Sequence, residues 1–276
     1  MNEDPFAAVA RRSPTALAQA LATFLIGAAL LCLAPAAAHA WTAPSQYAIG
    51  EQAARLTPPD LYRQIVRHRV AFREGMVDPY RNGDPQDTYK LSDGRGRLDE
   101  AIKISSRHAI DAIRAHQPFR EVVFRLGVVA HYVALANNPL YTDATDPQQG
   151  RWAQDFLNYL ESTQPRVEVV FYGFRRDLGP GHLEVLIRDT LKRGRALYPM
   201  VAREYQRVGY KSGIQAFDDR SIAYAVAALG YSHAVSDIAE VLRYIWLEAG
   251  GADRRVTLPL RGRQRIPMGR FERPSR

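Results

Sequence analysis

The stretch Gly127-Val-Val-Ala-His131-Tyr-Val-Ala-Leu135-Ala-Asn-Asn-Pro-Leu-Tyr141 decides the fold of this 276-residue chain. It completes a segment that opens at Pro118 and is nearly apolar on all sides beyond Arg125. A helix that is apolar around its circumference is expected at the centre of a globular domain. The sequence therefore predicts a central helix over about 118–136, with His131 and Leu135 on one face because they are four residues apart.

The remainder of the body also predicts helices, because it shows no sustained period-two alternation. Start and stop signals place a helix after Thr57 that ends at Gly75, and Pro199 is expected to kink or split a later one. The segment 165–180 is ambiguous and can hold a short strand within 167–172. The expected helices cover 45–56, 57–73, 98–115, 118–136, 147–162, 182–207 and 218–249, the last capped by Asp218 or Asp219. We expect one all-α, multi-helix domain over 41–250.

The first 40 residues predict an export signal. Arg11 and Arg12 precede an apolar stretch, and Ala38-His39-Ala40 forms a small-x-small cleavage site. This pattern is typical of a secretory signal peptide and not of a membrane span. We therefore expect a periplasmic or secreted protein, cleaved near Ala40.

The net charge of +8 is concentrated in the segment 251–276, which carries eight Arg against Asp253 and Glu272. We expect this basic tail to be disordered, and either to hold the protein near anionic surfaces or to be a solvated end. The body carries no basic face of the kind that binds nucleic acid. The single cysteine, Cys32, lies in the signal, so the mature chain has no thiolate zinc ligand.

The stretch from Gly127 to Tyr141 resembles the metal-binding helix of the zinc-dependent phospholipase C family, which shares its fold with fungal single-strand nucleases. That helix reads Gly-x-x-x-His-Tyr-x-x-Asp-x-x-x-Pro-x-His. Gly127, His131, Tyr132 and Pro139 match it, whereas Leu135 and Tyr141 stand at an Asp and a His position. The resemblance implies an all-α domain of the phospholipase C and nuclease type.

The resemblance extends to the segment after the signal. The family begins with a Trp whose amine and carbonyl bind metal, and Trp41 follows Ala40 here. Gln46 takes the position of a histidine ligand on the first helix. Farther on, the segment 72–79 resembles a family turn that supplies a carboxylate, for which Asp78 is the candidate; the alternative is a simple helix-stop turn.

A third match lies beyond Tyr141, where the family has a His and, four residues later, a Glu. Arg151 and Asp155 occupy these positions. Asp155 is therefore a candidate ligand, and the alternative is an i,i+4 ion pair with Arg151.

The resemblance thus leaves Trp41, Asp78, His131 and Asp155 as the tentative metal ligands. Zinc prefers nitrogen, sulfur or carboxylate oxygen, which Leu135 does not offer. We expect either no cofactor or a single weakly bound zinc ion. The alternative for His131 is a purely structural role, as a buried histidine on a core helix whose ring is satisfied by hydrogen bonds.

A second polar pair, His233 and Asp237, stands at i,i+4 on the last expected helix. It can line a cleft together with His131, or it can be a purely structural contact or a solvated face.

Three hypotheses follow. The first is an exported phospholipase C-like protein with a degenerate zinc site, non-catalytic, that binds an anionic or lipid-like ligand. The second is an active metal-dependent phosphoesterase, of the phospholipase C or nuclease type, with a reduced metal site. The third is a structural or interaction protein of the cell envelope.

Overall fold

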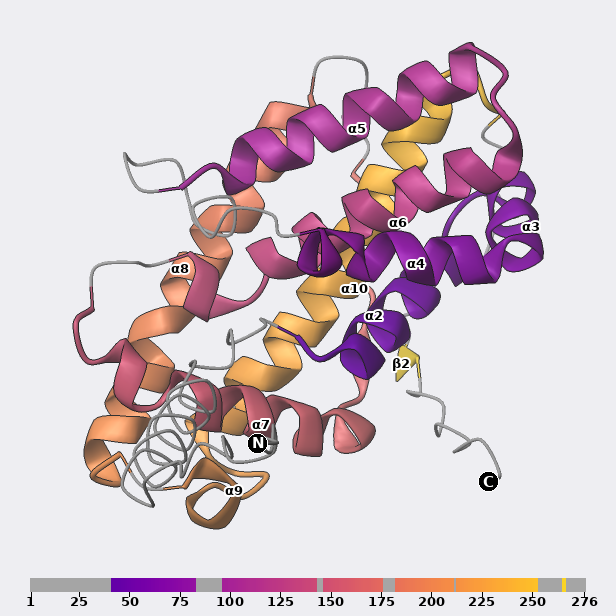
Figure 1. The fold of residues 1–276 in the computed structure, drawn as a ribbon. Helices are drawn as coiled ribbons and strands as arrows, with labels where there is room; N and C mark the ends of the chain where they lie inside the picture. Colours follow the sequence, from indigo (N-terminus) through magenta and orange to yellow (C-terminus); the bar gives the residue numbers. More distant parts are fainter. Residues whose placement is uncertain are drawn as a thin grey trace, which may run out of the picture. The chain divides into compact units, whose positions relative to one another are not determined.

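A computed structural model describes residues 41–82, 96–142, 146–175, 182–210, 212–252 and 265–266. The expected signal peptide over 1–40 and nearly all of the basic tail lie outside these residues. The elements, labelled as in Figure 1, are α2 (Ala43–Arg55), α3 (Pro59–Arg67), α4 (Arg69–Arg81), α5 (Leu98–Arg114), α6 (Phe119–Ala136), η2 (Pro139–Tyr141), η3 (Gln149–Arg151), α7 (Ala153–Thr163), η4 (Gln164–Arg166), β1 (Val169–Val170), α8 (Leu183–Arg207), α9 (Gly213–Ala216), α10 (Ile222–Glu248) and β2 (Arg265–Ile266).

The described residues form the all-α domain that the sequence predicts, with α6 at its centre. Helices α2, α4, α5 and α10 all pack against α6, and α8 lies along α10 (Figure 1). Every residue of α6 from Val129 to Ala136 is buried, as an all-round apolar helix requires. Within the described residues, no helix combines the length and apolar character that crossing a membrane needs.

Two glycines allow α4 and α6 to cross at close range. A Cβ on Gly127 would lie 2.2 Å from the carbonyl oxygen of Phe72, and one on Gly75 would lie 2.0 Å from that of Phe124. Both distances are far below van der Waals contact, so the backbones of α4 and α6 approach as closely as they do only because both positions lack a side chain. Gly127, part of the motif that resembles the phospholipase C family, therefore has a packing role.

The same crossing corrects the expected stop at Gly75. The helix break lies earlier, at His68, whose backbone leaves the helical region (φ −113°, ψ 33°). Helix α4 then runs through Gly75 and Pro79 to Arg81. Gly75 was misread because a glycine required for close helix packing has the same sequence signature as a helix-terminating glycine.

Other boundaries differ by a few residues. Thr42 and Ser221 cap α2 and α10 through their side-chain oxygens, in place of the expected Ser45 and Asp218 or Asp219. Helix α8 continues through Pro199 without splitting. The ambiguous segment does contain a strand, β1, which pairs antiparallel with β2.

Candidate functional site

His131 lies at the centre of a hydrogen-bond network between α2, α4 and α6, which it joins through Nδ1. Its side chain is fully buried, and its Nδ1 lies 2.8 Å from the carbonyl oxygen of Met76 and 3.1 Å from Oε1 of Gln46. Both partners are acceptors, so Nδ1 carries the proton. The amide nitrogen of Gln46 in turn donates to the hydroxyl of Tyr80 at 2.9 Å.

Aromatic rings enclose the same histidine. The ring of Tyr80 meets that of His131 edge-on at 4.5 Å between centroids, and Tyr132 does so at 5.0 Å. Gln46, at the position where the resemblance implies a histidine ligand, is fully buried and uses both ends of its amide in this network. The arrangement holds the imidazole in one orientation and one tautomer.

Trp41 is a second buried anchor beside this network. Its indole N–H donates to the carbonyl oxygen of Ala134 at 3.0 Å, and its ring packs 4.8 Å from that of Tyr231 on α10. The contacts fasten the start of α2 to α6 and α10. The side chain of Trp41 thus has a defined structural role within the core.

The two positions at which the chain departs from the family motif, Leu135 and Tyr141, both pack in or against the hydrophobic core. Leu135 is fully buried in the core cluster, one helical turn after His131. Tyr141 ends η2, is partly buried and packs against the core. Neither position presents a nitrogen or carboxylate donor, and the apolar environment of Leu135 would penalise a charged one.

Asp78 lies apart from His131's hydrogen bonds, in the last turn of α4. Its carboxylate is partly exposed and accepts from the amide of Asn82 at 2.6 Å. That contact is local, between residues four apart on one helix end. The described contacts of Asp78 therefore include none of the described partners of His131 or Trp41.

Asp155 is held by groups from α8 and α9. Its Oδ2 accepts the hydroxyl of Tyr205 at 2.6 Å and the backbone N–H of Gly213. Burial, and then the hydrogen bond to the Asp155 carboxylate, raise the pKa of the Tyr205 phenol, so this hydroxyl stays protonated and donates. Asp155 joins α7, α8 and α9.

The alternative prediction for Asp155, an ion pair with Arg151, is wrong. The described contacts of Arg151 are a hydrogen bond to Oε1 of Gln148 at 3.0 Å and a cation–π contact with the ring of Tyr210 at 4.1 Å. Arg151 lies in η3, and Trp152 leaves the helical conformation before α7 starts. The i,i+4 geometry of a continuous helix is therefore missing.

Within the residues that the structure describes, no three His, Cys, Asp or Glu side chains gather as a metal-binding group. Among the tentative ligands, His131 lies on α6 and Trp41 contacts α6 through the Ala134 carbonyl, but Asp78 and Asp155 are each engaged elsewhere. The donors that line His131 are an amide, a backbone carbonyl and two phenol rings. This chemistry does not fit the zinc cluster that the resemblance implies.

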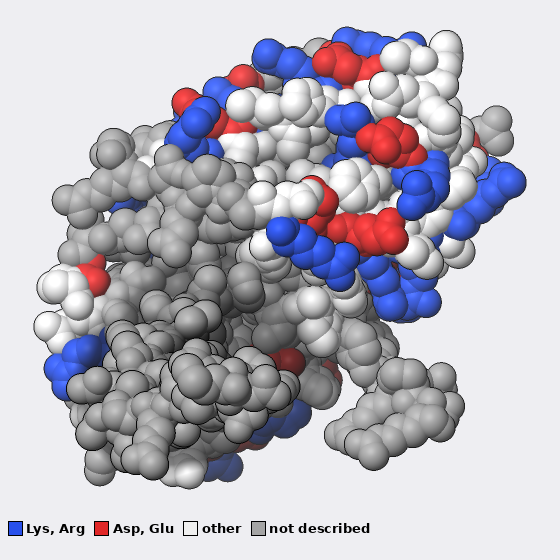
Figure 2. Space-filling view, in the orientation of Figure 1, with Lys and Arg blue, Asp and Glu red and all other residues white. Residues whose placement is uncertain are grey.

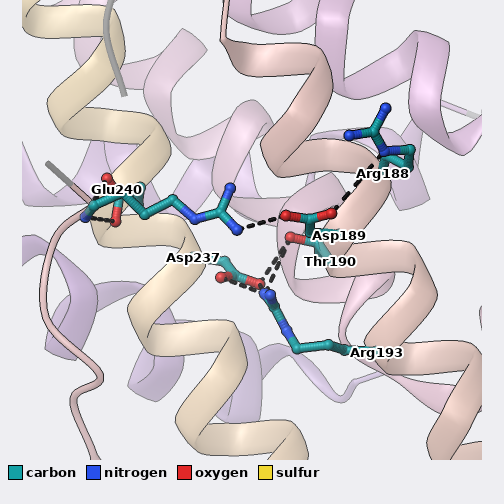
Figure 3. Close-up of polar contacts among 7 residues, drawn as sticks. Arg188, Asp189, Thr190, Arg193, Asp237 and Glu240 are labelled. Carbon is teal, nitrogen blue, oxygen red and sulfur yellow. Dashed lines mark hydrogen bonds and ion pairs between the residues drawn. The ribbon is translucent and has the colours of Figure 1, made fainter. Parts of the chain in front are cut away.

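His233 and Asp237 both lie on α10, and their described contacts are with α8 and with the segment after β1. Asp237 is bound by the guanidinium of Arg193 at 2.6 and 2.7 Å and by the hydroxyl of Thr190 at 2.9 Å, both from α8 (Figure 3). His233 stacks on Tyr172 at 4.8 Å. The pKa of His233 is lowered by burial and by the charge of Arg193, and raised in part by Asp237. The described contacts of the pair do not include His131.

Helix α10 also carries a ladder that the sequence analysis missed. Ser232, Ser236 and Glu240 stand four residues apart and accept the backbone N–H groups of Val170, Tyr172 and Arg175 at 3.0 to 3.2 Å. These three side chains bind an extended segment along the length of the helix. Their i, i+4, i+8 spacing indicates one polar face on α10. It does not reveal the donors, because the N–H groups that these side chains accept lie more than 60 residues away in sequence.

Glu240 closes the ladder, beside the ion pair between Arg175 and Asp189 (Figure 3). Glu240 is only 4% exposed, and burial raises the pKa of its carboxyl to about 7 against the opposing effects of the Arg175 N–H and Arg243. The hydrogen bond from Arg175 lowers the pKa of Asp189. The polar network thus links α8, α10 and the segment after β1.

No protein-family model and no curated protein sequence matches this chain. Among solved structures, the chain is similar to the alpha-toxin of Clostridium perfringens, from an avian strain, with a TM-score of 0.55 and 12% sequence identity. The match covers 78% of this chain and 66% of the toxin chain, so this chain spans somewhat less than two thirds of that protein. The likeness supports the fold that the sequence resemblance implied, a phospholipase C-like all-α domain.

Proposed function

We propose that this chain is an exported phospholipase C-like protein that does not use the family's zinc chemistry and acts as a non-catalytic binding domain. The observation that supports the proposal is the hydrogen-bond network of His131, Gln46, Tyr80 and the Met76 carbonyl at the position implied for the metal.

The donor chemistry carries the argument. Zinc needs about four nitrogen, sulfur or carboxylate ligands, and a catalytic zinc keeps a further position for water. Around His131, Gln46 has its amide oxygen on the histidine and its amide nitrogen on Tyr80, and Leu135 is apolar and fully buried. Without a metal-activated water or a Lewis acid, these residues offer no route to phosphodiester hydrolysis.

The other tentative ligands have structural partners of their own. Asp155 satisfies the buried hydroxyl of Tyr205 and an N–H group at the start of α9. The side chain of Trp41 satisfies the Ala134 carbonyl, whereas the resemblance assigns the main-chain amine and carbonyl of this residue to the metal. Each of these contacts is explained by the need to pair buried polar groups. A binding role then remains, and the ligand class we propose for it is anionic or lipid-like.

Metal analysis combined with an activity assay tests the proposal. We expect the purified protein, dialysed against zinc, to show no chelator-sensitive hydrolysis of phosphatidylcholine or of a phosphodiester. Asp78→Asn is the informative variant, because Asp78 is partly exposed and its contact with Asn82 is local. Chelator-sensitive hydrolysis that is lost in Asp78→Asn, with unfolding unchanged, would support a reduced-site phosphoesterase and overturn the proposal.

A further inference from the structure

The corner between α3 and α4 exposes apolar side chains that have no covering element among the described residues. Val66 is 52% exposed and Val70 is 70% exposed, and Phe119, at the start of α6, is 39% exposed. The inward residues of the same two helices, Leu61, Ile65 and Phe72, are buried. The core is therefore complete without the outward-facing valines, whose exposure needs a different explanation.

Arginines surround these apolar side chains. The segment from Leu61 to Arg73 contains four Arg and no acidic residue. Arg67 is exposed and has no hydrogen bond or ion pair within the described part of the chain, whereas Arg69 is bound to Glu51 at 2.6 Å. Figure 2 shows blue side chains gathered over α3 at the right of the view.

A pocket of about 300 Å³ lies within this corner. It is lined by the run from Val66 to Ala71 and by Arg120 of α6, whose guanidinium is 72% exposed and pairs with Glu74 at 3.4 Å. A second hollow, of about 520 Å³, lies on the α3 side and shares Val66 and Arg67. Cationic groups thus line recesses directly beside exposed apolar side chains.

We propose that the α3–α4 corner docks onto an anionic lipid bilayer. Val66, Val70 and Phe119 enter the headgroup region, while Arg67 and Arg120 contact lipid phosphates. The inference deepens the binding role proposed above and rests on it for the ligand class, but it does not depend on the state of the His131 network, which involves later turns of α4 and α6.

The chemistry favours a bilayer over a protein partner. Protein interfaces typically centre on a cluster of aromatic anchors, with charged residues depleted at their core. This corner instead places two valines and one phenylalanine among arginines, and Arg67 has no hydrogen-bond or ion-pair partner in the described structure. Apolar contact combined with attraction to anionic lipids is the usual basis of peripheral membrane binding, and one such patch gives weak, reversible association.

Vesicle co-sedimentation of the full protein tests the proposal. The vesicles contain phosphatidylcholine either alone or mixed with phosphatidylglycerol, in buffer with a chelator. Arg67→Gln should weaken binding to the anionic vesicles about fivefold, the contribution of one surface arginine. Val70→Ser, which removes both Cγ methyl groups, should weaken it about fifteenfold because two carbon groups leave the apolar phase.

Helix α5 offers matched controls, because Ile104 is 47% exposed and Arg107 is exposed without a described partner. Ile104→Ser and Arg107→Gln change composition and charge in the same way and should leave binding unchanged. Equal losses in the test and control variants would overturn the proposal and assign binding to net charge or to the basic tail.

Two further measurements distinguish a bilayer from two other occupants of this corner, a free anion and a second copy of the chain. Inorganic phosphate that binds in an Arg67-dependent manner, without vesicle binding, would make the pocket a free-anion site and overturn the bilayer proposal. A change in self-association of Val70→Ser, measured by light scattering without vesicles, would assign the corner to a second copy of the chain. Because a chelator is present throughout, failure here leaves the zinc proposal to its own test.

Discussion

The buried carboxyl of Glu240 makes the stability of this fold depend on pH, and Glu240→Gln should remove that dependence. The pKa of this group is raised from 4.5 to about 7, chiefly by burial. The charged groups that face it are Arg175 from the segment after β1 and Asp237 and Arg243 from α10. A raised pKa means that the folded state binds the proton more tightly than the unfolded state does.

The raised pKa of Glu240 stabilises the folded protein at low pH and not at high pH. The stabilisation is complete below the unfolded-state pKa of 4.5 and is lost as the pH rises through about 7. The shift of 7 − 4.5 = 2.5 units corresponds to about 3.5 kcal/mol at about 1.4 kcal/mol per unit. Between pH 5 and pH 8 the wild type should lose about 2.5 kcal/mol through this group, since a small part of the change lies below pH 5.

Urea unfolding at pH 5 and pH 8 measures the effect. A glutamine keeps an oxygen that can accept the Arg175 N–H, which Glu240 accepts at 3.1 Å, but it carries no charge. Glu240→Gln should therefore gain about 2 to 3 kcal/mol relative to wild type at pH 8, and much less at pH 5. Glu184→Gln, at an exposed side chain, is the control.

An equal loss of stability at both pH values would refute this reasoning. It would mean that Glu240 acts through its hydrogen bonds to the Arg175 N–H, and that its charge is not a liability in the folded protein.

Two further predictions concern the core and one of the tentative ligands. Gly127→Ala should destabilise the protein by at least about 2 kcal/mol, because its Cβ would meet the Phe72 carbonyl at 2.2 Å, whereas Gly150→Ala, with open space around it, should change little; thermal unfolding of both variants checks this. Asp155→Ala should cost about 2 to 4 kcal/mol, because the Tyr205 hydroxyl and the Gly213 N–H lose their acceptor. If Asp155→Ala is less stable than the wild type only when zinc is present, this second prediction is wrong and Asp155 is a metal ligand.

The fold could be predicted because its strongest signal is local. An apolar segment of 18 residues, now α6, can be read directly from its own sequence, and the Gly127–Tyr141 motif added a family resemblance. The position of Gly75 was misjudged because the oxygen that requires a glycine there, that of Phe124, belongs to another helix. A close approach between two helices leaves no mark that distinguishes it from a helix end.

The polar contacts were harder to predict, since their partners are distant in sequence. The i,i+4 spacing of His233 and Asp237 was read correctly as a shared face. The spacing did not indicate that Arg193, 44 residues away, would bind the carboxylate. In the same way Gln46 was identified as a lost histidine position, but its bonds to His131 and Tyr80 became visible only in the folded structure.

Calorimetric titration of the metal-free protein with zinc tests the central claim most directly, namely that the family's metal positions have become part of the packed core. We expect no binding at or below about micromolar zinc, since the described contacts of His131 include no other histidine and Leu135 supplies no donor. The Leu135→Asp, Tyr141→His double variant should either gain zinc affinity or unfold. Stoichiometric, micromolar or tighter zinc binding by the wild type, abolished in Asp78→Asn, would contradict the account.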